Sequence, residues 1–316
     1  MTRVFILTLL AMIAFASNSL LCRAALRDTT IDAATFTLVR ISSGAIGLWL
    51  ILTLRRSTAS VAAGSDRRNN PVGASFDSAL DRRRAPLQGD WISAFALFGY
   101  AAAFSFAYNT LSAGTGALLL FGAVQATMIF WGLQKGERLD PIQVIGLGVA
   151  ITGLVVLVFP GLTAPPLIGS ILMLSAGVAW GVYSLRGKGP TDAVAATTGN
   201  FLRAVPFAAL VSVIMIQRTK LDSLGVTYAV ISGAITSGLG YVIWYSVLPN
   251  LKASSAAVVQ LSAPVLVATG GILLLGEPIT LRYVIASIAV LGGIFLVVIE
   301  KQRGPSRTGG DHLLKK

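Results

Sequence analysis

Charged residues are scarce in this 316-residue chain: Asp, Glu, Lys and Arg together fill 12% of the positions, whereas hydrophobic residues fill 54%. A soluble domain carries about 25% charged residues, because it has to cover its surface with groups that water can solvate. Lipid requires no such cover. Together with a mean hydropathy of +0.76, the low charge excludes a soluble globular protein and indicates an integral membrane protein.

Cysteine and histidine are rarer still. Cys22 is the single cysteine and His312, in the polar tail, is the single histidine. An intramolecular disulfide is therefore impossible, and a histidine-based metal site or catalytic dyad within the membrane is excluded. Carboxylates are missing from the middle of the apolar segments, since all thirteen Asp and Glu residues lie in predicted loops, in the tail or at segment ends. The sequence therefore predicts no metal and no cofactor, and it disfavours an enzyme and an intramembrane proton relay.

Ten apolar segments are long enough to span a membrane as a helix, which takes about 20 residues. Two of their connections contain readable helix ends. Gly136 suits a left-handed end to the fourth segment, and Asp140-Pro141 suits the cap and first turn of the fifth. Gly276 and Thr280 play similar parts between the ninth and tenth segments. The expected fold is all-α. The predicted spans are 4–22, 33–54, 91–110, 113–134, 142–159, 166–185, 196–216, 225–248, 253–275 and 281–299.

The first segment also has the layout of a signal peptide, with Arg3 ahead of the apolar run Phe5–Ala16. Leu20-Leu21-Cys22 also hints at a lipoprotein site, but Leu21 is bulky where such a site normally requires a small residue. The apolar run is long for a signal peptide. We expect a retained helix. The long connection 55–90 holds seven arginines among Ala, Ser, Gly and Pro, and the tail 301–316 is similarly polar. Both have too little apolar surface to fold alone and are predicted to be disordered.

Lys and Arg are distributed unevenly between the two sides of the predicted spans. With the N-terminus inside, 18 of the 25 lie on cytoplasmic segments and five on the opposite side, while Arg40 and Arg203 lie within spans. Because positive loops face the cytoplasm, both termini are predicted to be cytoplasmic, in a multi-pass protein of a bacterial inner membrane. The net charge of +12 lies in loops rather than on a folded soluble face, so nucleic acid is not an expected partner.

The two halves of the chain resemble each other weakly. A shift of 163 residues places Arg23 on Arg186 and Arg40 on Arg203, and a shift of 140 places Gly136-Glu137 on Gly276-Glu277. A duplicated unit with an odd number of spans enters the membrane the second time in the opposite orientation. Inverted repeats of this kind place a binding site near the midplane, between the halves.

Several short motifs, in this order and spacing, resemble the drug/metabolite transporter superfamily of the EamA type, and the resemblance covers almost the whole chain. The clearest are Leu133–Leu139 (LQKGERL) followed by Pro141, and Leu274–Ile279 (LLGEPI). The supporting stretches are Phe15–Arg23 (FASNSLLCR), Trp244–Leu248 (WYSVL), Leu251–Ser254 (LKAS) and Ala263-Pro264.

This resemblance implies ten helices in two inverted five-helix units, 1–160 and 161–300, that move small metabolites, often outward. One position departs from the family pattern: Val124-Gln125 stands where members often have proline in the fourth span, as the second half has at Pro264. The resemblance therefore supports a prediction of the fold more strongly than a prediction of the substrate. The expected partners are a small-molecule substrate and the lipid bilayer, and the oligomeric state is left open.

Polar and aromatic side chains within the spans are the candidates for a central substrate cavity. The amides lie deep in spans one, four and nine, and either hydrogen bonds between helices or a ligand can satisfy them. The aromatic residues recur at three-residue spacing on spans six and eight, where packing or an interfacial belt is the alternative to ligand contact. The predicted cavity residues are Asn18, Gln125, Trp180, Tyr183, Tyr241, Trp244 and Gln260.

Arg40 and Arg203 are the two charges inside spans, each about seven residues from a span end. A central charge costs at least about 2.5–3.5 kcal/mol on insertion scales. Either they bond to carbonyls at a helix end, or they form an entrance charge for a substrate carboxylate.

The function indicated is a secondary transporter that exports a small amphipathic metabolite, such as an amino acid, without an intramembrane carboxylate for proton coupling. A membrane-embedded enzyme or partner subunit acting on lipid-linked substrates, and a non-transporting scaffold, remain the alternatives.

Overall fold

The computed structural model describes residues 2–69, 88–136, 139–161, 164–187, 192–247 and 259–303, and every regular element in these ranges is a helix. The helices are α1 (Thr2–Asp28), α2 (Ala33–Asn69), α4 (Trp91–Tyr108), α5 (Ala113–Gln134), α6 (Pro141–Val158), α7 (Leu167–Arg186), α8 (Ala193–Ile214), the short η1 (Ile216–Arg218), α9 (Ser223–Val230), η2 (Ile231–Leu239), α10 (Gly240–Val247), α12 (Ser262–Leu275) and α13 (Leu281–Arg303).

Eight spans in this part of the chain are long and apolar enough to cross a membrane, with α9, η2 and α10 forming one of them. Ser262–Leu275 and Leu281–Val297 are two shorter apolar helices. Large apolar side chains such as Phe130, Ile168 and Leu273 are more than half exposed on the outside of the bundle, where a soluble protein would be polar. The chain is therefore an all-helical, multi-pass membrane protein. The predicted start of the ninth span, 253–258, lies outside the described residues.

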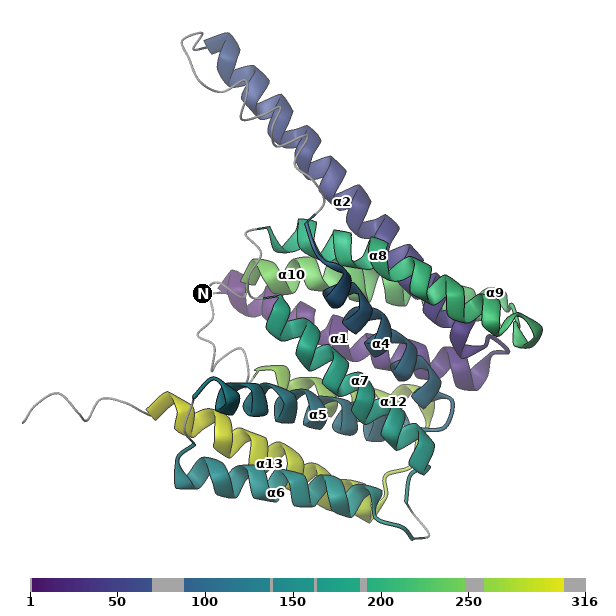
Figure 1. The fold of residues 1–316 in the computed structure, drawn as a ribbon, viewed down its shortest axis with the longest axis vertical. Coiled ribbons are helices and arrows are strands. Elements are labelled where there is room, and N and C mark those ends of the chain that lie inside the picture. The colour runs from purple at the N-terminus through teal and green to yellow at the C-terminus, as the bar shows by residue number, and fades with distance from the viewer. Residues whose placement is uncertain are drawn as a thin grey trace, which may run out of the picture.

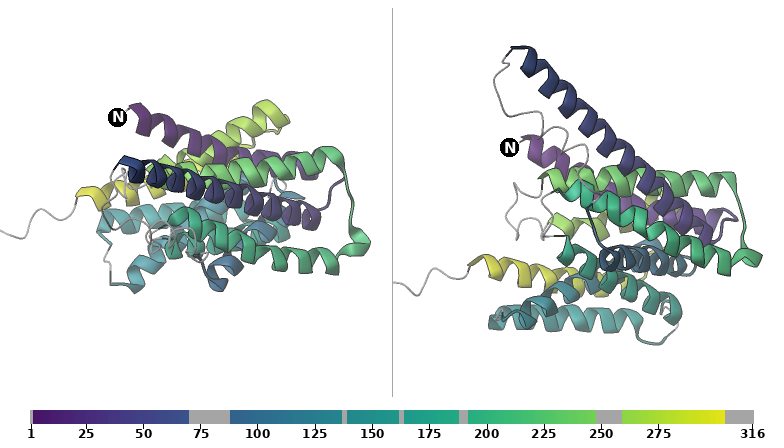
Figure 2. Two further views of the ribbon diagram at one scale, coloured as in Figure 1. Left: turned by 90° about the horizontal axis from the view of Figure 1, so that it is seen from above. Right: turned by 45° about the horizontal axis from the view of Figure 1, so that its top comes forward.

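The helices run side by side in one bundle (Figure 1, Figure 2). In Figure 1, α2 and α8 form one edge of the bundle, α6 and α13 form the other, and α1, α4, α7 and α10 lie between them. The beginning of α1 and the end of α13 lie at the same end of the bundle.

Helices from the two halves of the sequence interleave. The extensive packing pairs are α6 with α13, α4 and α5 with α7, α2 with α8 and η2, and α1 with α12 and α10, each of which joins an early helix to a late one. Small residues allow the close approach: Gly177 faces the carbonyl of Leu120, and Gly293 faces the backbone of Gly146. A side chain buried between neighbouring helices is therefore held by both halves of the chain.

The helix ends expected from the sequence are confirmed. Gly136 and Gly276 have φ values of 87° and 62°, in the left-handed region that favours glycine. Asp140 caps α6 in a capping box with Gln143, and Pro141 is the first helical residue. These caps satisfy the free backbone groups at helix ends, so the connections can be as short as the sequence indicates.

Three helices differ from expectation. α1 continues to Asp28 rather than ending near residue 22, and α2 continues to Asn69, beyond the edge of the bundle in Figure 1. Residues 55–69 of the segment predicted to be disordered are thus helical, because a lack of apolar surface prevents tertiary folding but not a helix of Ala, Arg and Ser. Residues 70–87, and the tail from 304 onward, lie outside the described ranges. The eighth span contains the π-helix η2, a form that occurs mostly as short insertions at functional sites.

Candidate functional site

A buried network of polar side chains links four helices in the middle of the bundle. The Asn18 amide of α1 donates from Nδ2 to the Tyr100 hydroxyl of α4 at 3.2 Å. The same hydroxyl oxygen accepts from Nη2 of Arg40 on α2 at 3.0 Å. On the other side, Oδ1 of Asn18 accepts from the hydroxyls of Ser232, at 2.5 Å, and Thr236, both on η2. The network therefore has Tyr100 at its centre and fixes α1, α2, α4 and η2 to one another.

The Arg40 guanidinium is the most unusual member of this network. Arg40 is 2% exposed. The central carbon of its guanidinium lies 5.2 Å from the ring centre of Tyr100 and 4.9 Å from that of Phe104. Its Nη1 is buried and has no hydrogen-bond partner among the residues that the structure describes. The titratable groups acting on it are Tyr100, Tyr241 and Cys22, so among the described residues no carboxylate neutralises it. Burying an unpaired charge is costly, which makes this position a candidate for function.

Aromatic rings from several helices surround the network. The ring centres of Tyr100 and Trp180 are 4.8 Å apart, and Trp180 stacks on Tyr241 at 5.3 Å. Phe15 joins them, at 5.8 Å from Tyr241 and 6.0 Å from Trp244. Together with the polar network, these rings form what we call the polar–aromatic cluster: Phe15, Asn18, Arg40, Tyr100, Phe104, Trp180, Ser232, Thr236, Tyr241 and Trp244.

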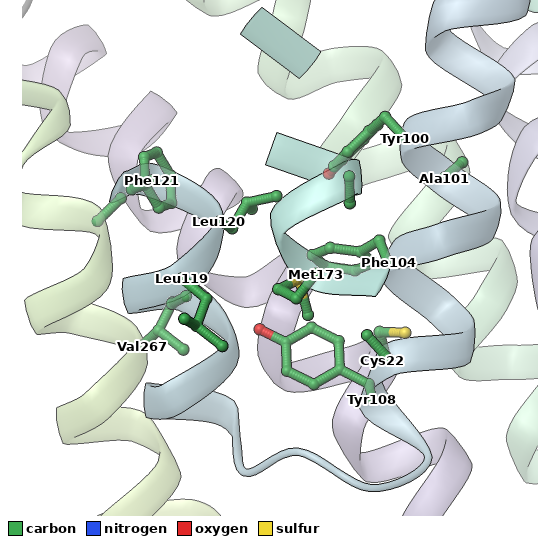
Figure 3. Close-up of a cluster of buried hydrophobic side chains, with 14 of the residues drawn as sticks. Cys22, Tyr100, Ala101, Phe104, Tyr108, Leu119, Leu120, Phe121, Met173 and Val267 are labelled. Carbon is green, nitrogen blue, oxygen red and sulfur yellow. The ribbon is translucent and has the colours of Figure 1, made fainter. Parts of the chain in front are cut away.

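Helical spacing explains why these side chains meet. Residues three or four apart lie on the same face of a helix, as do Tyr100 and Phe104 on α4, Phe15 and Asn18 on α1, and Tyr241 and Trp244 on α10. Figure 3 shows Tyr100, Phe104 and Tyr108 along one face of α4, with Cys22 of α1 close to Tyr108 and the Tyr100 hydroxyl directed away from α4. The cluster thus occupies the inward faces of helices from both halves.

The structure brings most of the predicted cavity residues together. Asn18, Trp180, Tyr241 and Trp244 lie in the cluster, and Tyr183 contacts it through Trp180 at 5.5 Å. Tyr183 itself lies close to Thr197 and Asn200 of α8.

The two glutamines are not linked to the cluster by any hydrogen bond in the described ranges. Gln125 is buried at 6% exposure on α5, and Gln260 is half-buried ahead of α12.

The two intramembrane arginines have different environments, although the predicted repeat pairs them. Arg203 is half-buried, and its Nη1 donates to the carbonyls of Gln88 at 3.2 Å and Gly199 at 3.0 Å. This is bonding to carbonyls near a helix end, one of the two alternatives for such a charge. Within the described ranges, the Arg40 guanidinium bonds to no backbone carbonyl. It contacts the Tyr100 hydroxyl and the rings of Tyr100 and Phe104 instead.

Several cluster members were missed by sequence reasoning. Tyr100, Phe104 and Phe15 were not singled out, nor were Ser232 and Thr236. A tyrosine in the middle of an apolar span was the one available signal for Tyr100, since a buried hydroxyl requires a partner. The hydroxyls of Ser232 and Thr236 on η2 could not be recognised from the sequence as part of a site, because serine and threonine are common in membrane helices and often bond to their own backbone.

A second polar site lies at the end of the bundle. Nε of Arg23, near the end of α1, pairs with Glu277 Oε1 at 3.0 Å, and its Nη1 donates to the Tyr108 carbonyl at 2.9 Å. Glu277 Oε2 accepts from the backbone N–H of Ala113 at 2.7 Å. The Glu277 side chain is 8% exposed, so this residue of the connection between α12 and α13 folds inward. It fixes the hairpin between α12 and α13 to α1 and α5.

Two aspartates at helix starts have altered pKa values. Burial acts to raise the pKa of Asp90, but hydrogen bonds from Ser93 and from Arg186 outweigh it, so the pKa lies below the usual value. Burial likewise opposes ionisation of Asp32, and the Thr35 hydroxyl and the Lys220 N–H lower its pKa overall. Both carboxylates therefore stay ionised as N-caps above about pH 4. Their contribution to stability is lost as the pH falls through the lowered pKa.

No group of three His, Cys, Asp or Glu side chains that could hold a metal ion occurs within the part of the chain that the structure describes. The cluster offers hydroxyls, an amide, a guanidinium and ring faces, which are groups that bind and orient a small solute.

Comparison with known proteins shows that the chain is similar to the members of one family. The model of the EamA-like transporter family matches residues 167–299. An uncharacterized protein of Pseudomonas aeruginosa is 50% identical over 307 residues, which cover 97% of this chain and 98% of that protein. An uncharacterized transporter of Archaeoglobus fulgidus is 30% identical over 193 residues, covering 60% of this chain and 68% of that protein.

The fold has a counterpart among solved structures. One protein crystal structure superposes with a TM-score of 0.58 at 18% identity, covering 96% of this chain and 99% of the other. At this identity the match concerns the fold alone.

Proposed function

Because the chain belongs to the EamA-like transporter family, we propose that it is a secondary carrier that exports a small amphipathic metabolite by alternating access. The polar–aromatic cluster carries this proposal. It is buried between helices of both halves, where inverted-repeat carriers place their substrate. Its ring faces suit an apolar group, and its amide, hydroxyls and guanidinium suit a polar one.

The family and the apolar helices make the chain a membrane transporter, and they favour transport over an enzymatic activity. The finer topology is part of the proposal: ten spans in two inverted units, with both termini in the cytoplasm of a bacterial inner membrane. Two observations support it. The start of α1 and the end of α13 lie at one end of the bundle, and the strongest helix pairs join the two halves.

Reporter fusions test this topology. A cytoplasm-active reporter fused after residue 70, and another fused at the C-terminus, are both expected to be active, because positively charged segments remain inside. A periplasm-active reporter at the same positions should stay silent, and after Lys220 it should be active. An active periplasmic reporter at the C-terminus would contradict the ten-span model.

Transport is expected not to require a proton gradient. A coupled carrier needs a group whose protonation changes during the cycle, which in membranes is usually Asp, Glu or His. None of these contributes to the cluster, and Glu277, at the end of the bundle, is already paired with Arg23. Arg40 cannot serve, because guanidinium stays protonated.

Flux in proteoliposomes measures this directly. With equal substrate on both sides and an imposed pH difference, exchange without net accumulation is the expected result. Accumulation driven by the pH difference alone would refute the uncoupled mechanism. If purified protein moves no solute from a broad panel of amino acids and related metabolites, the carrier proposal itself fails in favour of an enzyme subunit or a scaffold.

A further inference from the structure

Two hydrogen-bond donors in the cluster are unused. Nη1 of Arg40 is buried and has no hydrogen-bond partner in the described part of the chain. The Tyr100 hydroxyl accepts from both Asn18 and Arg40, which occupies both of its lone pairs and leaves its proton available. No acceptor takes that proton among the residues that the structure describes. Nη1 belongs to the same guanidinium whose Nη2 bonds to the Tyr100 hydroxyl, so the two free donors belong to groups that are already in contact.

Charge points to the same conclusion. Around Arg40 the titratable side chains are two tyrosines and Cys22, which are neutral at pH 7 at their usual pKa values. The ring faces of Tyr100 and Phe104 offset part of the cost of burying the guanidinium. A full negative charge is absent from this environment in the described chain, and a ligand can supply it.

We propose that Arg40 and Tyr100 bind a carboxylate of the transported substrate, with Nη1 and the phenol O–H as its donors. This inference rests on the proposed function and narrows it to monoanionic or zwitterionic carboxylates. The stacked rings of Trp180 and Tyr241 then lie beside the rest of the molecule, since Trp180 also contacts Tyr100.

The chemistry favours a carboxylate over other anions. A carboxylate is planar, and its two oxygens can accept at the same time from Nη1 of Arg40, in a charge-assisted bond, and from the Tyr100 O–H. One fixed positive charge balances one negative charge. A doubly charged phosphate would leave an excess negative charge among aromatic rings, and the neighbouring groups Asn18, Ser232 and Thr236 are uncharged. An organic cation would meet repulsion from Arg40.

Matched pairs of acids and amides test the proposal on the intact protein. Butyrate, 3-phenylpropionate, L-leucine and L-phenylalanine are each compared with their primary amides by calorimetric titration in detergent. For at least one pair, the acid is expected to bind about tenfold or more tightly than the amide, because only the acid forms charge-assisted bonds to Arg40. If no pair differs in Kd, the proposal is wrong.

Variants then locate the effect. Arg40→Gln should bring the acid-to-amide ratio close to one, whereas Arg203→Gln, which alters the other intramembrane arginine, should leave the ratio unchanged. Tyr100→Phe removes one of the two proposed donors and should reduce the acid-to-amide ratio by several-fold. If Arg40→Gln does not fold, Tyr100→Phe and Arg40→Lys provide the test. A ratio that survives in Arg40→Gln or in Tyr100→Phe would overturn the assignment.

Flux separates this inference from the carrier proposal. If wild-type proteoliposomes transport the acids and their amides equally, the carrier stands and the carboxylate site falls. If the acids bind through Arg40 but no panel compound crosses the membrane, the site stands and the carrier proposal falls.

Discussion

Replacing Glu277 with alanine is expected to destabilise the protein by about 3–5 kcal/mol, because it leaves the Arg23 guanidinium without its counter-ion in a buried position. The two side chains are 15% and 8% exposed, so solvent screens the pair little. The substitution also frees the N–H of Ala113 at the start of α5. Thermal unfolding of the purified protein in detergent measures the effect, with an expected fall in midpoint on the order of 10 °C.

A second ion pair close by provides the control. Arg27 and Asp28 are also paired, but they are 32% and 43% exposed, and exposed pairs contribute about 0–1 kcal/mol. Asp28→Ala should therefore change the midpoint little. The double variant Arg23→Met, Glu277→Met should lose less stability than Glu277→Ala, since no unpaired charge remains. Equal effects of Glu277→Ala and Asp28→Ala would show that burial of the first pair has no energetic consequence.

Gly233→Ala is expected to cost about 3 kcal/mol, at the upper end of the range for overpacking. A Cβ at Gly233 would overlap the carbonyl oxygen of Arg40 and Oγ of Ser43. The first of these is backbone and cannot turn aside, so α2 and η2 have to separate. Because Arg40 is on α2 and Ser232 is on η2, substrate binding should weaken together with stability. Thermal unfolding and the flux assay report the two effects.

Gly292→Ala in α13 is the matched control. A Cβ there has no neighbour within 4 Å, and alanine favours a helix over glycine by about 1 kcal/mol. This variant should be as stable as the wild type or slightly more so. If Gly233→Ala unfolds at the wild-type temperature, the close contact between α2 and η2 is not essential.

The sequence predicted most of the helices and their caps, because both depend on local chemistry. Apolar runs of sufficient length indicate spans, and Gly136, Asp140 and Gly276 mark ends through backbone conformation and capping alone. The extension of α2 to Asn69 and the π-helix η2 were missed. The first was missed because composition was read as disorder, and the second because glycine-rich apolar stretches do not distinguish α from π hydrogen bonding.

The candidate site was only partly predictable. Polar residues within spans could be identified one by one, and this found Asn18 and Arg40. Their shared partner, Tyr100, depends on how α1, α2 and α4 pack, and long-range packing leaves no local pattern in the sequence. For the same reason, the sequence shows Glu277 only as a residue of a predicted loop, although its carboxylate pairs with Arg23, 254 positions earlier in the chain.

The pairing of α6 with α13 has a consequence for biosynthesis. Gly146 and Gly153 of α6 lie against Gly293 and Ala289 of α13, and Gln143 donates to the Val297 carbonyl. More than 120 residues separate the end of α6, at Val158, from the start of α13, at Leu281. At about 5–20 residues per second, the ribosome takes roughly 6–25 s to supply the partner. During that interval, the glycine face of α6 is open to lipid or to an insertion chaperone, and a chain that ends before α13 never covers it.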